Sequence, residues 1–283
     1  MKPSRRLLAA LAIAAFALSS HAHFQMIHLP AGAFGEDVSE APLTLLFAHP
    51  FSGGEVMDMG KGLDGQPHPP QAFGVMHRGE KVDLLEYLKP LDFGPSDAQR
   101  RGFRVPFKFR GMGDYVFYCD PGYYWEPGED IFIRHYTKTI VNRIGQATDW
   151  KNPVGFPVEI MPLVKPYALW AGNVFRGRVV KLVDGKPMPL ADTLVEVEYL
   201  NHEVGENAFA NGPRVTPPNG AFETQQIRTD ANGEFVYGLP FGGWWGFAAL
   251  VDGDEKVPGP DGEEKEVELG GLLWVWAAEA TTR

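Results

Sequence analysis

Short runs of alternating side chains, separated by glycine and proline, recur along the whole chain. The 283 residues include 33 glycines and 24 prolines, and 12% of the residues are aromatic. Glycine and proline interrupt regular structure, and alternation with a period of two places one set of side chains on each face of a β-strand. Helical periodicity is rare, so we expect only short helices over residues 81–88 and 96–100. The sequence therefore predicts an all-β protein.

The alternation forms two series of expected strands. The first series covers 43–49, 103–110, 113–118 and 131–136, and the second covers 173–180, 194–199, 243–250 and 272–276. A stretch with several prolines, 157–171, separates them. We therefore expect two β-sandwich domains of the immunoglobulin-like or transthyretin-like kind, over residues 23–165 and 166–283.

The first 22 residues have the pattern of a secretory signal peptide. Three basic residues within the first six positions precede an apolar run, and the small residues Ser20 and Ala22 follow at the positions that a signal peptidase requires. We expect cleavage after Ala22 and a periplasmic location. Cleavage after Ser20 is the alternative, and it would give a chain that begins His21-Ala22-His23.

Charge and composition limit the classes of partner that the exported chain is expected to bind. The leader holds three of the 26 basic residues and none of the 36 acidic ones, so its removal changes the net charge from −10 to −13. Such an acidic chain disfavours nucleic acid and anionic membranes and favours cations. Beyond the leader no apolar run approaches the roughly 20 residues of a membrane span, so we expect no membrane insertion. Cys119 is the single cysteine, and no intrachain disulfide can form.

Cleavage after Ala22 would make His23 the first residue of the mature chain. A terminal histidine offers an α-amino group and an imidazole nitrogen to the same metal ion, which an internal histidine cannot do. The α-amino group has an ordinary pKa of about 7.7–8.0, so a metal can displace its proton near neutral pH. The sequence therefore points to a metal site at His23.

Further ligands are expected from the predicted strands and one loop. His49 ends a strand and His135 lies on a face with Ile131 and Ile133, while Met57 and Met59 are candidate outer ligands. Imidazole suits nickel, cobalt, copper and zinc, and thioether suits copper(I). The alternative for each is structural: a hydrogen-bonded histidine, or a methionine that fills a gap in the core. We expect three further histidines to lie mostly at the solvated surface: His28, His68 and His77.

Signatures of known enzyme classes are missing from the sequence. It contains no nucleophile elbow, no His-Glu-x-x-His pair and no phosphate-binding glycine loop. Cys119 has no nucleophile motif around it, and we expect it to pack as a small apolar residue. We therefore expect a binding protein, not an enzyme.

Motifs along nearly the whole mature chain resemble a known family. They are His23-Phe24, His49-Pro50-Phe51, Ala72-Phe73-Gly74-Val75, Tyr124-Trp125-Glu126-Pro127, His135-Tyr136-Thr137-Lys138-Thr139, Ala171-Gly172-Asn173-Val174-Phe175 and Gly243-Trp244-Trp245-Gly246-Phe247-Ala248-Ala249. The chain resembles the periplasmic proteins found beside energy-coupling-factor transporters of nickel and cobalt, long catalogued as a domain of unknown function. The resemblance implies an accessory protein that handles Ni²⁺ or Co²⁺ for a membrane-embedded transporter. The second half also resembles the carboxypeptidase-regulatory-like sandwich module, through the turn before Pro187 and the segment Thr229-Asp230 to Phe235.

Three functions remain open at this point. In the first, the protein binds Ni²⁺ or Co²⁺ through His23, His49 and His135 and passes the ion to its transporter. In the second, the same terminal chelate is a copper histidine brace, as in copper carriers and copper-dependent polysaccharide oxygenases, with the aromatic residues 123–125 available for sugar stacking. In the third, the protein is an interaction module that binds no metal.

Overall fold

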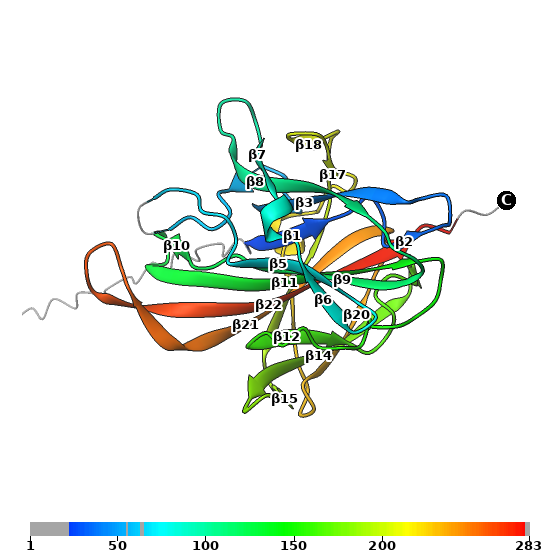
Figure 1. Ribbon diagram of the computed structural model, residues 1–283. Helices are drawn as coiled ribbons and strands as arrows, with labels where there is room; N and C mark the ends of the chain where they lie inside the picture. The colour runs from blue at the N-terminus through cyan, green and yellow to red at the C-terminus, as the bar shows by residue number, and fades with distance from the viewer. Residues whose placement is uncertain (1–22, 55, 63–64, 281–283) are drawn as a thin grey trace, which may run out of the picture.

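Three β-sheets lie in layers, which we call the upper, central and lower sheets (Figure 1). The computed structural model describes residues 23–280 except residues 55, 63 and 64. The predicted signal peptide, residues 1–22, lies outside the described residues. The all-β prediction is confirmed, because the described residues contain β-strands and two short 3₁₀ helices, η1 (Leu85–Tyr87) and η2 (Gly220–Phe222).

The upper sheet has five strands, with the order β1-β3-β8-β7 and with β4 paired to β3. Their bounds are β1 (Phe24–His28), β3 (Glu40–Ala48), β4 (Val56–Met57), β7 (Lys89–Phe93) and β8 (Arg100–Lys108). The lower sheet contains β12 (Val158–Pro162), β14 (Val174–Val183), β15 (Lys186–Pro189) and β20 (Glu234–Gly238).

The central sheet is the longest, with the order β19-β16-β21-β22-β11-β9-β5-β6. In that order the bounds are β19 (Gln225–Arg228), β16 (Leu194–Tyr199), β21 (Gly243–Pro258), β22 (Glu264–Ala278), β11 (Ile131–Arg143), β9 (Gly113–Asp120), β5 (Ala72–His77) and β6 (Glu80–Asp83). Three short strands pair with the ends of β11 and β22: β2 (Ala33–Phe34), β10 (Tyr124–Glu126) and β13 (Leu169–Trp170). A separate hairpin is formed by β17 (Glu203–Val204) and β18 (Phe209–Ala210).

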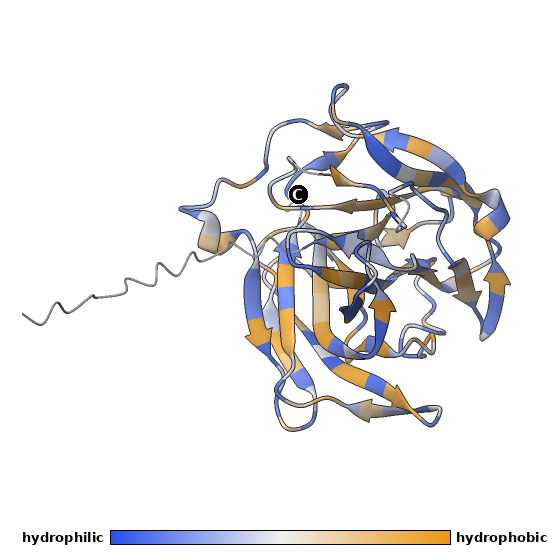
Figure 2. Ribbon diagram, turned by 90° about the vertical axis from the view of Figure 1, so that its left-hand side faces the viewer, coloured by the Kyte–Doolittle hydropathy of each residue, from blue (hydrophilic) through white to orange (hydrophobic). Residues whose placement is uncertain are grey.

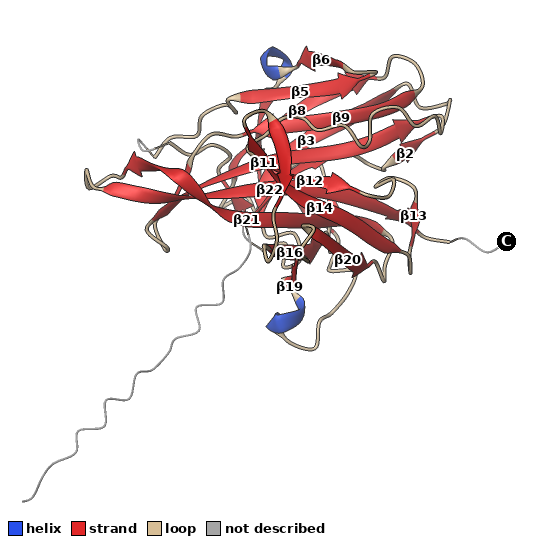
Figure 3. Cartoon of the chain, turned by 90° about the horizontal axis from the view of Figure 1, so that it is seen from below, coloured by secondary structure: helices blue, strands red, loops and turns tan. Residues whose placement is uncertain are grey.

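The alternation in the sequence explains the layers. Leu272 and Trp274 of β22 belong to the core between the central and upper sheets, whereas Leu273 and Val275 belong to the core between the central and lower sheets. A strand that is covered on both faces is apolar at successive positions, which is the pattern of 272–276. Strands with one covered face alternate between apolar and polar residues (Figure 2). Figure 3 shows the lower sheet from below, in front of the central strands.

The central sheet runs across the predicted domain boundary. β11 from the first half pairs in parallel with β22 from the second half, from Phe132–Val267 to Thr139–Trp274. The two halves of the chain therefore share one sheet. The division at residue 165 into two domains stays a prediction, and the shared sheet means that each half completes the core of the other.

The two expected helices are wrong. Residues 81–88 form the end of β6 and the single 3₁₀ turn η1, and residues 96–100 form a turn that leads into β8. Val82 pairs with Val75 of β5, so sheet pairing overrides the helical pattern there. Within the described residues, no helix has the length and apolar character needed to cross a membrane.

Candidate metal centre

The first strand pair places His23 beside His49. β1 and β3 are antiparallel, and Phe24 is paired with Ala48, so the next position in register brings the two histidines opposite each other. Their ring centroids are 4.7 Å apart, with an angle of 46° between the ring planes. The structure therefore brings together two of the predicted ligands, at the end of the sandwich where β1 begins.

A carboxylate lies next to this histidine pair. β10 folds back antiparallel on β11, with Glu126 paired to Ile131, and this pairing carries Glu126 to the same end of the sandwich. Its Oε2 lies 3.6 Å from Nε2 of His23, and both side chains are largely buried. A negative charge beside an imidazole favours a bound cation.

His135 lies across the sandwich from the pair, on β11. The ring of Phe47 contacts both sides, with its centroid 5.6 Å from that of His23 and 6.2 Å from that of His135. No three His, Cys, Asp or Glu side chains among the described residues are close enough together to hold one ion. The structure therefore places Phe47 between His23 and His135 and leaves His135 apart from the His23–His49 pair.

The His135 imidazole is buried, with 2% of the residue exposed. Its Nε2 lies 3.4 Å from Oε1 of Glu268, and its Nδ1 has no hydrogen-bond partner among the described residues. The ring fits against Gly270 of β22, where a Cβ atom would overlap it. A buried nitrogen without a hydrogen-bond partner costs free energy. The packing of the ring has to offset this cost to hold the imidazole in place.

Two further carboxylates lie on the face of the central sheet that carries His135. Glu196 and Glu198 of β16 are buried, although the alternation of this strand resembles that of a strand with one solvated face. Burial raises the pKa of Glu196, a hydrogen bond from Gln226 opposes this rise, and the charge of Glu268 adds to it. Burial also raises the pKa of Glu198, to about 8, against the effect of hydrogen bonds from Thr224 and Phe51.

Sequence reasoning missed four carboxylates: Glu126 beside His23, Glu268 beside His135, and the buried Glu196 and Glu198 of β16. A usable signal was present for Glu126, which lies in an acidic and aromatic segment between two expected strands. For the other three, the deciding factor is the order of the strands in the central sheet, and an alternating pattern does not contain that information.

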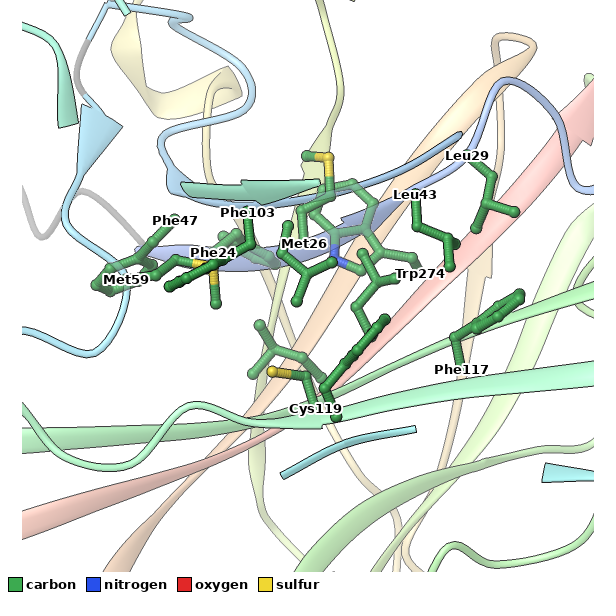
Figure 4. Close-up of a cluster of buried hydrophobic side chains, with 14 of the residues drawn as sticks. Phe24, Met26, Leu29, Leu43, Phe47, Met59, Phe103, Phe117, Cys119 and Trp274 are labelled. Atoms are coloured by element: carbon green, nitrogen blue, oxygen red, sulfur yellow. The ribbon is translucent and has the colours of Figure 1, made fainter. Parts of the chain in front are cut away.

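The two methionines lie in the core. Met57 is paired with Phe47 across β4 and β3, and both Met57 and Met59 are at most 5% exposed. They belong to the same apolar cluster as Phe24 and Phe103. Figure 4 shows Met59 beside Phe24 in this cluster. This position suits gap-filling side chains, and their role as outer ligands stays a prediction.

The expectation of solvated histidines holds for one residue of three. His68 is exposed, but His28 and His77 are only partly exposed, so the expectation is wrong for them. His77 stacks on Tyr115 at 4.1 Å, and its Nδ1 lies 2.8 Å from the carbonyl oxygen of Asp114. Cys119 packs in the core as expected, and burial raises the pKa of its thiol.

The aromatic loop offers little surface for stacking. Tyr123 and Trp125 both pack on Phe132, with ring centroids 6.0 Å and 5.0 Å from it. Tyr124 is 8% exposed and packs on Phe47. Sugar stacking needs exposed ring faces, and these rings direct much of their surface into the protein.

Solved structures resemble the chain only distantly. The alpha-2-macroglobulin of E. coli is 10% identical with a TM-score of 0.21; the match covers 90% of this chain, which spans 14% of the macroglobulin. The Yersinia pseudotuberculosis adhesin InvE is 11% identical over 87% of this chain and 58% of its own, with a TM-score of 0.23. A DUF3823 family protein from Bacteroides uniformis is 14% identical over 78% of this chain and 97% of its own, with a TM-score of 0.20.

No curated protein matches the sequence. A family model does match, and it covers residues 20–253, which include the histidine pair, Glu126 and most of the central sheet. The chain therefore belongs to the DUF4198 family, a domain of unknown function.

Proposed function

We propose that this protein captures Ni²⁺ or Co²⁺ in the periplasm and delivers the ion to a membrane-embedded uptake transporter. The observation that carries the proposal is the contact of the His23 and His49 rings, 4.7 Å apart at one end of the sandwich. Neutral imidazole is a good ligand for both ions. The protein acts in this proposal as a carrier, without catalysis.

The donor set fits such an ion if the leader is removed after Ala22. His23 then contributes its α-amino group and its imidazole, and His49 contributes a second imidazole. This chelate needs no third histidine, carboxylate or cysteine. It can therefore form although no three such side chains among the described residues lie close enough together to hold one ion. His135 and the two methionines, Met57 and Met59, remain candidates for a rearranged site.

The acidic surroundings support a cation. Glu126 lies 3.6 Å from His23, and Glu268 lies 3.4 Å from His135. The formal charge of −10 for the whole chain attracts cations over a longer range. Both effects increase the local concentration of metal without fixing which metal binds.

The test begins with the exported protein, because the proposal depends on its first residue. N-terminal sequencing or intact mass should give His23. Competition with a chromophoric chelator should then show tight Ni²⁺ and Co²⁺ binding, which His23→Ala and His49→Ala each weaken by at least about 100-fold. Even residues that only hold a ligand in place are worth about 10- to 100-fold in metal affinity.

The matched control is His68→Ala, which removes an exposed imidazole and should leave the affinity unchanged. A mature chain that begins beyond His23 would contradict the proposal. So would the wild-type affinity in His23→Ala.

The same geometry also suits copper, and a histidine brace is the second candidate. The His23–His49 pair provides the two imidazoles of such a brace. Affinity alone cannot separate the candidates, because Cu²⁺ binds most nitrogen sites more tightly than Ni²⁺ or Co²⁺. The metal content of protein isolated from cells supplied with all three metals distinguishes them. Peroxide-dependent cleavage of a polysaccharide by the copper-loaded protein would favour an oxygenase.

A further inference from the structure

A cavity of about 500 Å³ opens beside His28, at the opposite end of β1 from the histidine pair. Its walls come from the outer face of the upper sheet, the β17–β18 hairpin and the start of β21. The volume lies in the range of pockets that hold small molecules. The residues that give it chemical character are Arg104, Arg214, His28, His202, Trp244 and Trp276.

Two guanidinium groups border this cavity. Arg104 is held by its neighbours: its Nε donates to Oγ1 of Thr44 at 3.3 Å, and its Nη2 donates to the carbonyl oxygen of Gly205 at 3.3 Å. Arg214 is less constrained, because its only hydrogen bond from the side chain to the described residues is a long one, 3.5 Å from Nη1 to the hydroxyl of Tyr199. Arg214 therefore has donors available for an anion.

The inner end of the cavity has a positive field. The pKa of His28 is lowered to about 3, first by burial and then by the charges of Arg214 and Arg104. Glu203 and Glu206 also line the cavity. The Glu203 carboxylate accepts a hydrogen bond of 2.7 Å from Asn211. His28 is thus neutral at physiological pH, and it offers a hydrogen bond without a charge.

Aromatic and unsatisfied polar groups complete the lining. The indole N–H of Trp244 donates to the carbonyl oxygen of Leu29 at 2.9 Å, which fixes this ring in the wall. Nε2 of His202 is buried and has no hydrogen-bond partner among the described residues. This nitrogen packs against Gly53, where an added Cβ atom would lie 2.5 Å from it, so it is covered by protein and is not a contact for the ligand.

We propose that this cavity binds a small organic carboxylate. The carboxylate meets Arg214 and Arg104, and the apolar part of the ligand lies against Trp244 and Trp276. Arginine holds a carboxylate through two parallel hydrogen bonds, and a tryptophan face contributes apolar contact area. The proposal is independent of the metal site at His23.

The experiment titrates the full exported chain with benzoate and, separately, with benzyl alcohol and inorganic phosphate. Calorimetry should show that benzoate binds at least about tenfold more tightly than either comparator, since benzyl alcohol lacks the charge and phosphate lacks the aromatic ring. Equal binding of benzyl alcohol would overturn the role of the arginines. Equal binding of phosphate would overturn the role of the aromatic wall.

Variants locate the binding. Arg214→Gln should weaken benzoate binding about tenfold, because it removes a charge-assisted contact. Arg100→Gln is the matched control, since Arg100 is exposed and, among the described residues, its side chain donates only to the carbonyl oxygen of its neighbour Gln99. Wild-type benzoate affinity in Arg214→Gln would overturn the proposal. His23→Ala should leave benzoate binding unchanged, so failure here is distinguishable from failure of the metal proposal.

Discussion

The imidazole of His23 faces that of His49 at 4.7 Å, and the strand register alone creates this contact. The five paired positions of β1 and β3 end at Phe24–Ala48, so the histidines occupy the next step of the ladder. Opposite residues in an antiparallel pair direct their side chains to the same face. A register change of one residue would separate the two rings. The histidine pair therefore depends on the correct pairing of β1 with β3 at the edge of the upper sheet.

The thioethers of Met57 and Met59 should contribute little to metal affinity. Both are buried in the apolar cluster with Phe47, and leucine has a similar volume and no sulfur ligand. We expect Met57→Leu and Met59→Leu to keep the Ni²⁺ affinity within about twofold and to change stability by less than about 1.5 kcal/mol. A large loss of affinity in a variant that remains folded would identify a sulfur ligand, and chelator competition with urea unfolding measures both quantities.

Replacement of Gly270 by alanine should destabilise the junction between the two halves of the chain. Gly270 is paired with His135 across β22 and β11, and a Cβ atom there would overlap the imidazole. Overpacking of this kind costs about 1–3 kcal/mol. Urea unfolding measures the loss. Gly238→Ala is the control, because no atom lies within 4 Å of its added Cβ, and unchanged stability in Gly270→Ala would contradict the packing argument.

The sequence was sufficient to predict the class of fold and many of its strands. The run 272–276 became the buried part of β22, and 194–199 became β16 with the expected bounds. Alternation and apolar runs report burial on one face or on two, which is local information. The expected helix at 81–88 failed because Val82 pairs with Val75, a contact set by tertiary structure.

The site was only partly predictable for the same reason. His23 and His49 come together through one antiparallel pair, but the position of His135 depends on β11 lying next to β22. That parallel pairing joins residues more than 100 positions apart in the sequence. A periodic pattern does not show that Phe47 lies between His135 and the His23–His49 pair. It also does not show that Glu196 is buried.

The buried ion pair of Lys138 and Glu159 should be important for stability. Nζ lies 2.7 Å from Oε2, and both side chains are at most 3% exposed. Glu159→Gln leaves the ammonium group buried without its counter-charge, which costs about 3–5 kcal/mol. The control is Glu266→Gln, which breaks an exposed pair with Lys256 and should cost less than about 1 kcal/mol. Equal losses in the two variants would contradict the importance of burial.

The Lys138–Glu159 pair should also make the free energy of unfolding depend on pH in the acid range. Burial alone would raise the pKa of Glu159, but the Lys138 ammonium and backbone N–H donors outweigh it and lower this pKa. The stabilisation is therefore present above the unfolded pKa of about 4.3 and is lost as the pH falls through the lower folded value. The stability difference between wild type and Glu159→Gln should shrink below about pH 4, as urea unfolding at several pH values would show.

Glu198 should make the free energy of unfolding depend on pH in the opposite direction. Its pKa of about 8 lies above the unfolded value, so the folded state holds a proton that the unfolded state has released. Stability contributed by this group is fully present below about pH 4.3 and is lost as the pH rises to about 8. Glu198→Gln should remove this part of the decline, because the amide stays neutral throughout.

The amide can also keep both contacts of Glu198, which makes the substitution a clean test. The glutamine oxygen can accept from the N–H of Phe51, now 3.2 Å from Oε2, and the amide nitrogen can donate to the hydroxyl of Thr224. We therefore expect Glu198→Gln to match wild type near pH 4 and to exceed its stability at pH 8 and above, by urea unfolding. Because Phe51 follows His49 by two residues, the N–H contact also holds the histidine loop. A variant that is less stable than wild type at every pH would show instead that Glu198 is ionised in the folded protein.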